Sequence, residues 1–264
     1  MRVSPITGHK NPLILYEQPL NERIRTFLRL EHLFAQIHAH LQGDTTAATR
    51  AALEALFDIM DIAGKADLRQ ELTKELDRQL STFRALMTSP GVCQDILGNL
   101  INDLQNLLTQ TTRDTHTFGH ELKHHELLSA VRQRRAIPGG ACGFDIPEYH
   151  LWLSAAAPHR HTAIHRWLTE FKPVTQATQL LLRLIRESAT ATPQIATAGL
   201  FQHALDNNRS YQLIQVKVHD HALFPEISGG KHRFAIRFMQ LTGNDGHATP
   251  VTGDLSFELN CCAL

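Results

Sequence analysis

The sequence predicts an α+β protein in which an N-terminal helical bundle domain precedes a smaller C-terminal antiparallel β domain. Apolar residues recur at helical spacing through most of the chain, whereas near the C-terminus they alternate with polar residues, which is the period of a strand. Between two helical stretches, the sequence AIPGGACGFDIP interrupts the helical pattern. We therefore expect a mostly helical domain over residues 13–190, with 140–153 as an extended segment after the Pro-Gly-Gly junction, and an antiparallel β domain over residues 191–264.

Amphipathic helices account for most of the first domain. The first helix starts near Leu20, where Asn21 is suited to cap its N-terminus, and its buried face carries Phe27 and Phe34. Further helices are expected at residues 47–63, 67–87, 96–108, 118–135, 158–171 and 174–188. The short connections between them favour a helical bundle. The sequence ATATP, residues 189–193, is interpreted as a linker to the second domain.

The junction interrupts the helical pattern at residues 131–147. Proline disfavours a helical conformation in the residue before it, so Ile137-Pro138 ends the preceding helix. The double glycine that follows permits backbone angles that other residues resist. Positive charge in the last helical turn offsets the negative end of the helix dipole, and three residues supply it: Arg132, Arg134 and Arg135. We expect the rest of the fold to pack on either side of this point.

The C-terminal quarter has the pattern of a small antiparallel sheet. In RFAIRF, the residues Phe234, Ile236 and Phe238 alternate with arginine and alanine, and LIQVKV and LSFELN show the same period. Residues 200–205 are expected to form a further strand, and Gly-Gly and Gly-Asn-Asp-Gly sequences supply turns. Each strand is thus predicted to bury one face.

The charge balance argues against nucleic acid and membrane as partners. The 264 residues include 26 Lys or Arg and 26 Asp or Glu, and the isoelectric point is near 7.3. A helical nucleic-acid binder that uses VRQRR is an alternative that this balance disfavours. No apolar run approaches the roughly 20 residues of a membrane span. The four cysteines form no C-x-x-C pair, which favours a reducing compartment, and the terminal CCAL is interpreted as a strand end rather than a prenylation box.

The sharpest match to a catalytic motif is HELKH at residues 120–124. In H-E-x-x-H helices, two histidines one turn apart bind zinc and the glutamate acts as the base. Lys123 inside the motif and the lack of an evident third ligand favour a solvated helix face instead. A zinc-dependent hydrolase that uses the HELKH helix is therefore kept as the alternative function. No nucleophile elbow, P-loop or Rossmann fingerprint occurs, so catalysis has little support from the residues, and we assign no metal site.

The remaining candidates are basic side chains in three places: on the first helix, at the junction with Arg132, Arg134 and His150, and on the strand that Lys231 precedes. Arg25, Arg29 and His32 fall at i, i+4 and i+7 on the polar side of the first helix. In RFAIRF, Arg233 and Arg237 occupy the face opposite to the phenylalanines. The guanidinium fork pairs carboxylates in a bidentate manner, which suits the binding of a carboxylate-bearing segment. Each of these residues, taken singly, is also explained as a solvated surface residue.

Five blocks of sequence resemble the ZapD family of bacterial cell-division proteins: YEQPLNERIRTFLRLEHLF, ELTKELDRQ, VRQRRAIPGGACGFDIPEYHLWL, FPEISGGKHRFAIRFM and LSFELNCC. They occur in the family's order and span nearly the whole chain from about residue 13, whereas residues from about 92 to 121 depart from the family pattern. The resemblance implies a cytoplasmic homodimer at the division site (midcell). It also implies binding to the C-terminal tail of the tubulin-like protein FtsZ and cross-linking of FtsZ filaments, without catalytic activity or cofactor.

The resemblance further implies that a basic cleft of the dimer holds the tail. The residues in matching motifs that we assign to this cleft are Arg25, Arg29, Arg132, Arg134, His150, Lys231, Arg233 and Arg237. A single tail is expected to bind weakly, because a disordered peptide loses entropy on docking. Two sites on a dimer gain avidity on a polymer that displays many tails. Filament bundling then follows from valence and geometry alone.

Overall fold

A computed structural model describes residues 13–264, except residues 66, 92, 114–115, 231 and 243–245. The chain divides into two compact units: a helical unit of residues 26–182, and a β unit that combines residues up to 25 with residues 183–264. The first strand, β1 (Ile14–Pro19), therefore belongs to the β unit although it precedes every helix in the sequence. The predicted α+β class, with helices followed by antiparallel sheets, is confirmed.

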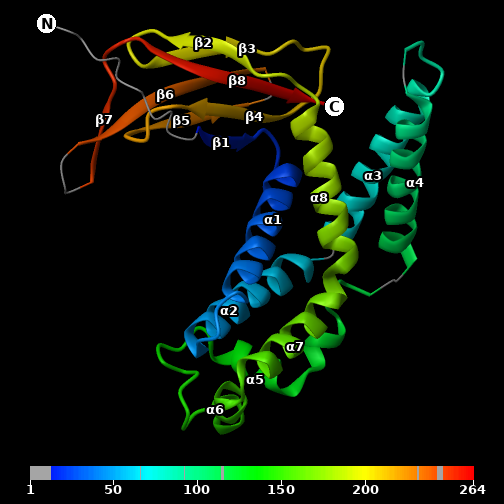
Figure 1. Ribbon diagram of the computed structural model, residues 1–264, viewed down its shortest axis with the longest axis vertical. Coiled ribbons are helices and arrows are strands. Elements are labelled where there is room, and N and C mark those ends of the chain that lie inside the picture. Colours follow the sequence, from blue (N-terminus) through cyan, green and yellow to red (C-terminus); the bar gives the residue numbers. More distant parts are fainter. Residues whose placement is uncertain (1–12, 66, 92, 114–115, 231, 243–245) are drawn as a thin grey trace, which may run out of the picture. The chain divides into compact units, whose positions relative to one another are not determined.

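The helices follow the predicted amphipathic segments closely (Figure 1). They are α1 (Glu22–His40), α2 (Thr46–Ala63), α3 (Asp67–Leu86), α4 (Gln94–Arg113), α5 (Glu126–Arg134), α6 (Pro147–Ser154), α7 (Ala157–Leu168) and α8 (Lys172–Glu187), with short 3-10 turns η1 (Glu121–His124) and η2 (Thr169–Phe171). The ends have local causes: the side chain of Thr45 accepts a hydrogen bond from the backbone N–H of Ala48, and Gly64 closes the same helix. No helix in the described part of the chain combines the length and apolarity that a bilayer span requires.

The core of the helical unit consists of the apolar stripes that the sequence predicted. Phe27 of α1 and Phe57 of α2 are fully buried, as is Phe171 in η2. α3 and α4 pack along one another as a hairpin, and α2 packs against α7 (Figure 1). Apolar burial of this kind supplies most of the stability of a helix in a protein.

A buried arginine connects several of these segments through hydrogen bonds. Arg160 of α7 is only 4% exposed. Its guanidinium donates hydrogen bonds to Thr49 Oγ1 at 3.0 Å and to the carbonyl oxygens of Asp44, Leu153 and Ala155. All four acceptors are neutral, and two of them are carbonyls at the C-terminal end of α6, where a helix dipole favours a cation. Arg160 thereby joins α6 and α7 to the connection between α1 and α2.

The β unit is a sandwich of two antiparallel sheets (Figure 1). One sheet has the strand order β1, β4 (Tyr211–Val218), β8 (Leu255–Ala263), β2 (Thr192–Ala196). In the other, β6 (Arg233–Thr242) has β5 (Leu223–Gly229) along one edge, with β3 (Leu200–Ala204) and β7 (His247–Pro250) along the other. The alternating residues Phe234, Ile236 and Phe238 pack inward against Val216 and Phe257, as the period of two predicted.

A polar network stabilises the outward face of the first sheet. Arg186 at the end of α8 donates two hydrogen bonds to Glu17 of β1, at 2.9 and 2.7 Å, and Gln215 of β4 donates a third at 2.8 Å. Asn260 of β8 extends the network by donating to Gln215. Burial raises the pKa of Glu17, but the hydrogen bonds from Arg186 and Gln215 outweigh burial and hold it below its ordinary value. Beside the network, burial raises the pKa of the Cys262 thiol to about 12.

The structure corrects three local predictions. Residues 140–153 were predicted to be extended, but turns lead directly into α6, because Pro147 occupies the first helical turn, where its missing N–H is not needed. The predicted linker at 189–193 ends inside β2, since an edge strand tolerates Pro193. The predicted helix at 118–135 is divided, because His125 is extended and caps the N-terminus of α5.

Candidate functional site

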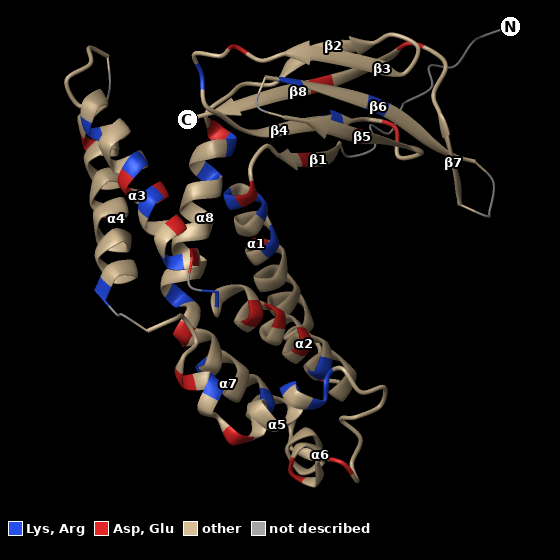
Figure 2. Ribbon diagram, turned by 180° about the vertical axis from the view of Figure 1, so that it is seen from behind, with Lys and Arg blue, Asp and Glu red and all other residues tan. Residues whose placement is uncertain are grey.

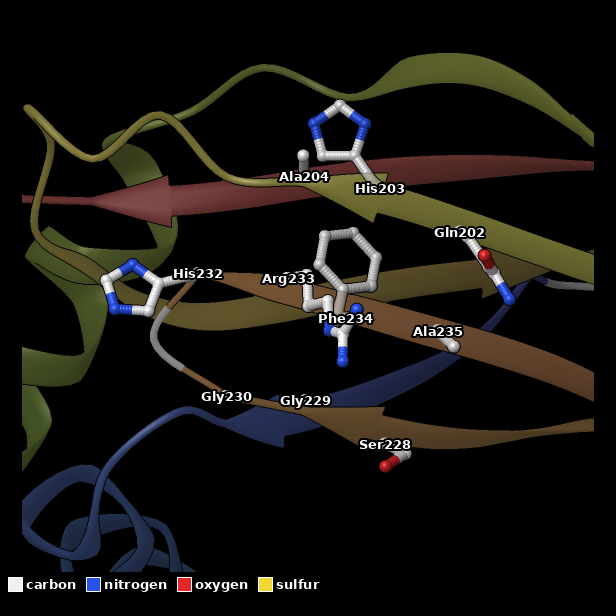
Figure 3. Close-up of a pocket in the computed structure, with 10 residues that line it drawn as sticks. All are labelled: Gln202, His203, Ala204, Ser228, Gly229, Gly230, His232, Arg233, Phe234 and Ala235. Atoms are coloured by element: carbon white, nitrogen blue, oxygen red, sulfur yellow. The ribbon is translucent and has the colours of Figure 1, made fainter.

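An open hollow of about 750 Å³ lies on the outer face of the sheet formed by β3, β6 and β5. Figure 3 shows the residues that line it: Gln202, His203, Ala204, Ser228, Gly229, Gly230, His232, Arg233, Phe234 and Ala235. Successive side chains of a strand point to opposite faces, so Arg233 and Ala235 face outward while Phe234 is buried between the sheets. Side chains of Arg233 and Gln202 extend from neighbouring strands (Figure 3).

The strand register sets the residues of this face in rows across the sheet. Arg233 lies opposite Ala204, and Ala235 lies between Gln202 on β3 and Ser228 on β5. The small side chains beside Arg233 leave the space that forms the hollow. The site is therefore a shallow depression with a guanidinium group at one end and amide and hydroxyl groups beside it.

Two arginines on this face have no partner among the residues that the structure describes. Arg233 and Arg237 are both exposed, and neither side chain makes an ion pair or hydrogen bond with any residue that the structure describes. They are four positions apart on the strand, which corresponds to about 13 Å. Glu226 is the cross-strand neighbour of Arg237 in the register. The basic bands on β6 are visible in Figure 2.

Two histidines that the sequence analysis did not select line the same hollow, although His203 is the register partner of Phe234 and so shares its face of the sheet, opposite to that of Arg233. His232 hydrogen-bonds through Nδ1 to Asn207 Oδ1 at 2.7 Å, and the His203 ring lies 5.5 Å from the ring of Phe234. His232 directly precedes Arg233 in the sequence, which was an available signal. His203 could not have been found in this way, because only the pairing of β3 with β6 brings it here.

The basic stripe predicted on the first helix exists. Arg29 and His32 are exposed on α1, and the Arg29 side chain has no bonded partner among the described residues. Arg25 differs, because its Nε lies 3.2 Å from Glu22 Oε1 in the first turn of the helix and its side chain is 39% exposed. The stripe is thus available for contact mainly through Arg29 and His32.

The arginines of the junction, in contrast, are engaged within the chain. Arg132 forms an ion pair with Asp61 of α2, and Arg134 Nη1 lies 3.2 Å from Asp145 Oδ1. Residues two apart on a helix point in different directions, so the two arginines contact different carboxylates. Their charge is already compensated on the chain itself.

Arg135 is the most strongly held of the three. It pairs with Glu54 at 2.8 Å and Asp61 at 3.2 Å, and also with Asp58. Burial lowers the pKa of Arg135, but Asp58 and Glu54 outweigh burial and raise it. A second hollow, of about 400 Å³, lies beside the junction and is lined by both signs of charge, including Arg50 and Glu54. The ion pairs of Arg135 therefore stabilise the fold of the junction.

Two predicted site residues remain. His150 is exposed on α6, and its ring lies so close to Gly143 that a Cβ added there would be 3.3 Å from His150 Cγ. Lys231 falls outside the described residues. The structure therefore brings Arg233 and Arg237 together on one face of the β unit, and it places Arg29, Arg132, Arg134 and His150 in the helical unit.

The HELKH sequence has a different local structure from a metalloprotease helix. His120 precedes the 3-10 turn η1, and the turn ends at His124, so the motif does not lie on a regular α-helix. The rings of His120 and His124 lie 5.1 Å apart in an edge-to-face contact. Within the described residues, no group of three His, Cys, Asp or Glu side chains is placed to hold a metal ion.

The class that these features define is a two-unit α+β protein, with a helical unit and a β sandwich that presents exposed arginines on one sheet. Comparison with known proteins is more specific. The model of the family "ZapD: Cell division protein" matches residues 28–237. The chain belongs to the ZapD family of cell division proteins.

Individual relatives match over nearly their whole length. A cell division protein ZapD of Ralstonia pickettii is 41% identical over 252 residues, which cover 95% of this chain and 99% of the relative. The ZapD of Coxiella burnetii is 36% identical over 253 residues, covering 95% and 98% of the two chains. That of Janthinobacterium sp. is 36% identical over 256 residues, covering 96% and 100%.

Proposed function

We propose that this chain acts as a homodimer that binds the C-terminal tail of FtsZ and cross-links FtsZ filaments, thereby stabilising the Z ring at the division site. Membership of a family of cell division proteins supports a role in cell division. The observation that carries the tail-binding proposal is the pair of exposed arginines, Arg233 and Arg237, on the sheet face that holds the hollow. Bidentate pairing with carboxylates is the interaction for which such side chains are suited.

The state of each arginine supports a ranking among the proposed contacts. An arginine already paired with a carboxylate has part of its charge compensated, so a further carboxylate gains less by binding it. This applies to Arg132 and Arg134, which contact Asp61 and Asp145. Among the described residues, no carboxylate forms an ion pair with Arg29, Arg233 or Arg237. We therefore expect these three to contribute most to tail binding, and Arg25 and the junction residues, including His150, to contribute less.

Valence converts a weak contact into filament bridging. A flexible tail pays an entropic cost when it docks, so one site binds weakly. A dimer with one site per protomer meets a polymer with many tails, and after the first tail binds the second is present at high effective concentration. The bridge needs no cofactor and no catalytic step. Because the contacts are charged and exposed, added salt should weaken them.

Pelleting with FtsZ polymers tests this function. The protein should co-sediment with polymers of intact FtsZ and stay in the supernatant with polymers of FtsZ that lack the C-terminal tail. Light scattering should report bundles only with intact FtsZ. Equal pelleting with the two polymers would refute tail binding.

Charge-reversal variants locate the contact. Arg233→Glu, Arg237→Glu and Arg29→Glu should each reduce pelleting, while size-exclusion chromatography with light scattering still finds a dimer. Arg166→Glu is the matched control, because Arg166 is exposed on α7 and belongs to none of the proposed contacts. A loss with Arg166→Glu as large as with Arg233→Glu would mean that net charge, and no particular site, governs binding. A monomeric wild-type protein would contradict the bridging mechanism.

A further inference from the structure

A third hollow, of about 330 Å³, lies in the helical unit, where residues of α2, η1 and α5 meet. We call its lining the cationic hollow, and it consists of Met60, Leu122, Lys123, Ser129, Arg132 and Gln133. Met60 and Leu122 are almost fully buried, so the accessible part of the lining is polar. Of the described residues that form it, the two charged ones are both cations.

Lys123 brings a positive charge that no carboxylate neutralises among the described residues. Its Nζ donates a hydrogen bond to Thr117 Oγ1 at 3.1 Å, and it lies 3.6 Å from the position that a Cβ on Gly64 would take. Gly64 caps the C-terminus of α2, where the helix dipole favours a cation. An ammonium group has three donors, so two remain for a ligand. The HELKH sequence thus brings its lysine, rather than its two histidines, to a hollow.

α5 supplies three further donor groups from one side of the helix. Ser129, Arg132 and Gln133 stand at i, i+3 and i+4, which are neighbouring positions on a helix surface. Gln133 Nε2 donates to Ser129 Oγ at 3.3 Å, and the Ser129 hydroxyl proton has no acceptor among the described residues. Arg132 contacts Asp61 through Nη2, and a guanidinium group has five N–H donors, so further donors remain.

This set of donors fits a phosphate group. Phosphate carries a charge of about −1.5 to −2 at neutral pH and at least three strong acceptor oxygens. Two cations match that charge, and the hydroxyl and amide groups add donors for the remaining oxygens. A carboxylate, with one charge and two oxygens, would use fewer of them. The volume of the hollow falls at the lower end of the range of small-molecule sites, and its buried apolar residues suit a small organic group.

We propose that the cationic hollow binds a small phosphate anion, either free or as a phosphomonoester, with Lys123 and Arg132 as the charged donors. The site belongs to the helical unit, whereas Arg233 and Arg237 belong to the β unit. The inference therefore does not depend on the proposed binding of the FtsZ tail to the sheet.

Isothermal titration calorimetry of the full chain tests the site with two probes, inorganic phosphate and adenosine monophosphate. The ionic strength is held constant with sodium chloride, because salt screens exposed charges. The wild-type protein should bind at least one probe with a dissociation constant of about 1 mM or lower. Lys123→Met keeps the aliphatic stem but removes the charge, and it should weaken this binding about tenfold. Ser129→Ala should weaken it about threefold.

Lys172→Met is the matched control, because Lys172 is exposed at the start of α8, does not line the hollow and carries the same charge. It should leave both dissociation constants unchanged. Absence of binding by the wild-type protein, unchanged binding by Lys123→Met, or an equal loss with Lys172→Met would each overturn the proposal.

The two probes distinguish the possible sources of the phosphate. Tighter binding of adenosine monophosphate than of inorganic phosphate, lost in Lys123→Met, would assign the site to a phosphomonoester. Equal or weaker binding of adenosine monophosphate, with the same dependence on Lys123, would assign it to free phosphate. Far-UV circular dichroism checks the fold of each variant, and Ser129→Ala carries the test if Lys123→Met does not fold.

Discussion

Replacing Arg160 with methionine should destabilise the helical unit strongly. Methionine keeps much of the aliphatic volume but removes every hydrogen bond that the guanidinium donates. The hydrogen bonds to Thr49 Oγ1 and the Leu153 carbonyl are buried, whereas those to Ala155 and Asp44 are partly accessible to water. A buried acceptor left without a donor costs about 1–3 kcal/mol, so two of them predict a loss of roughly 3 kcal/mol.

The two tryptophans of the chain, Trp152 and Trp167, make this loss measurable, because both lie in the helical unit with their rings 5.7 Å apart. Tryptophan fluorescence during urea unfolding therefore reports on this unit. With a slope of about 2 kcal/mol per molar urea, the midpoint of Arg160→Met should fall by roughly 1.5 M. Arg166→Met, an exposed change in the same helix, should leave the midpoint within about 0.3 M. An unchanged or higher midpoint for Arg160→Met would show that the cost of burying the charge equals or exceeds the value of its hydrogen bonds.

Three further changes test other parts of the structure. Glu17→Gln should lower the urea midpoint of the β unit at neutral pH, measured by far-UV circular dichroism. Because the fold depresses the pKa of Glu17, the carboxylate's contribution to stability is present above the ordinary pKa near 4.5 and is lost as pH falls through the folded pKa. The stability of the variant should therefore lack this part of the dependence on acid pH. Gly119→Ala should cost about 3 kcal/mol or more in the tryptophan-detected transition, since Gly119 has φ +71° and an added Cβ would lie 2.8 Å from Cε1 of the buried Phe171; wild-type behaviour would contradict this packing. Ala198→Asn should stabilise the β unit by roughly 0.5–1 kcal/mol, because Ala198 has φ +49° in a tight turn where asparagine is better tolerated; a lower midpoint would refute this assignment of strain.

The sequence predicted the elements whose periodicity is local. The alternation around Phe234 predicted β6 and its buried face, and that alternation alone placed Arg233 and Arg237 on the opposite face. The apolar stripe of α1 likewise left Arg29 exposed. In these cases a period of two or of 3.6 decides which side chains share a surface, and no distant contact changes the result.

Features that depend on distant pairing could not be predicted in this way. β1 joins the sheet only because Ile14 pairs with Val218, some 200 residues later in the chain. The hollow depends equally on the register of β3 and β5 against β6, which no local pattern contains. The ion pairing of the junction arginines could not be predicted either, because Asp61, which pairs with Arg132, lies on a helix that is distant in sequence.

The most direct test of the central claim measures binding of the FtsZ tail peptide to wild-type protein and to the double variant Arg233→Glu/Arg237→Glu at low and moderate salt. We expect the wild-type protein to bind one peptide per protomer with an affinity that falls as salt rises. The double variant should remain dimeric and lose nearly all binding at both salt concentrations. Undiminished, equally salt-sensitive binding by the double variant would contradict the assignment of the tail site to this face of the β unit.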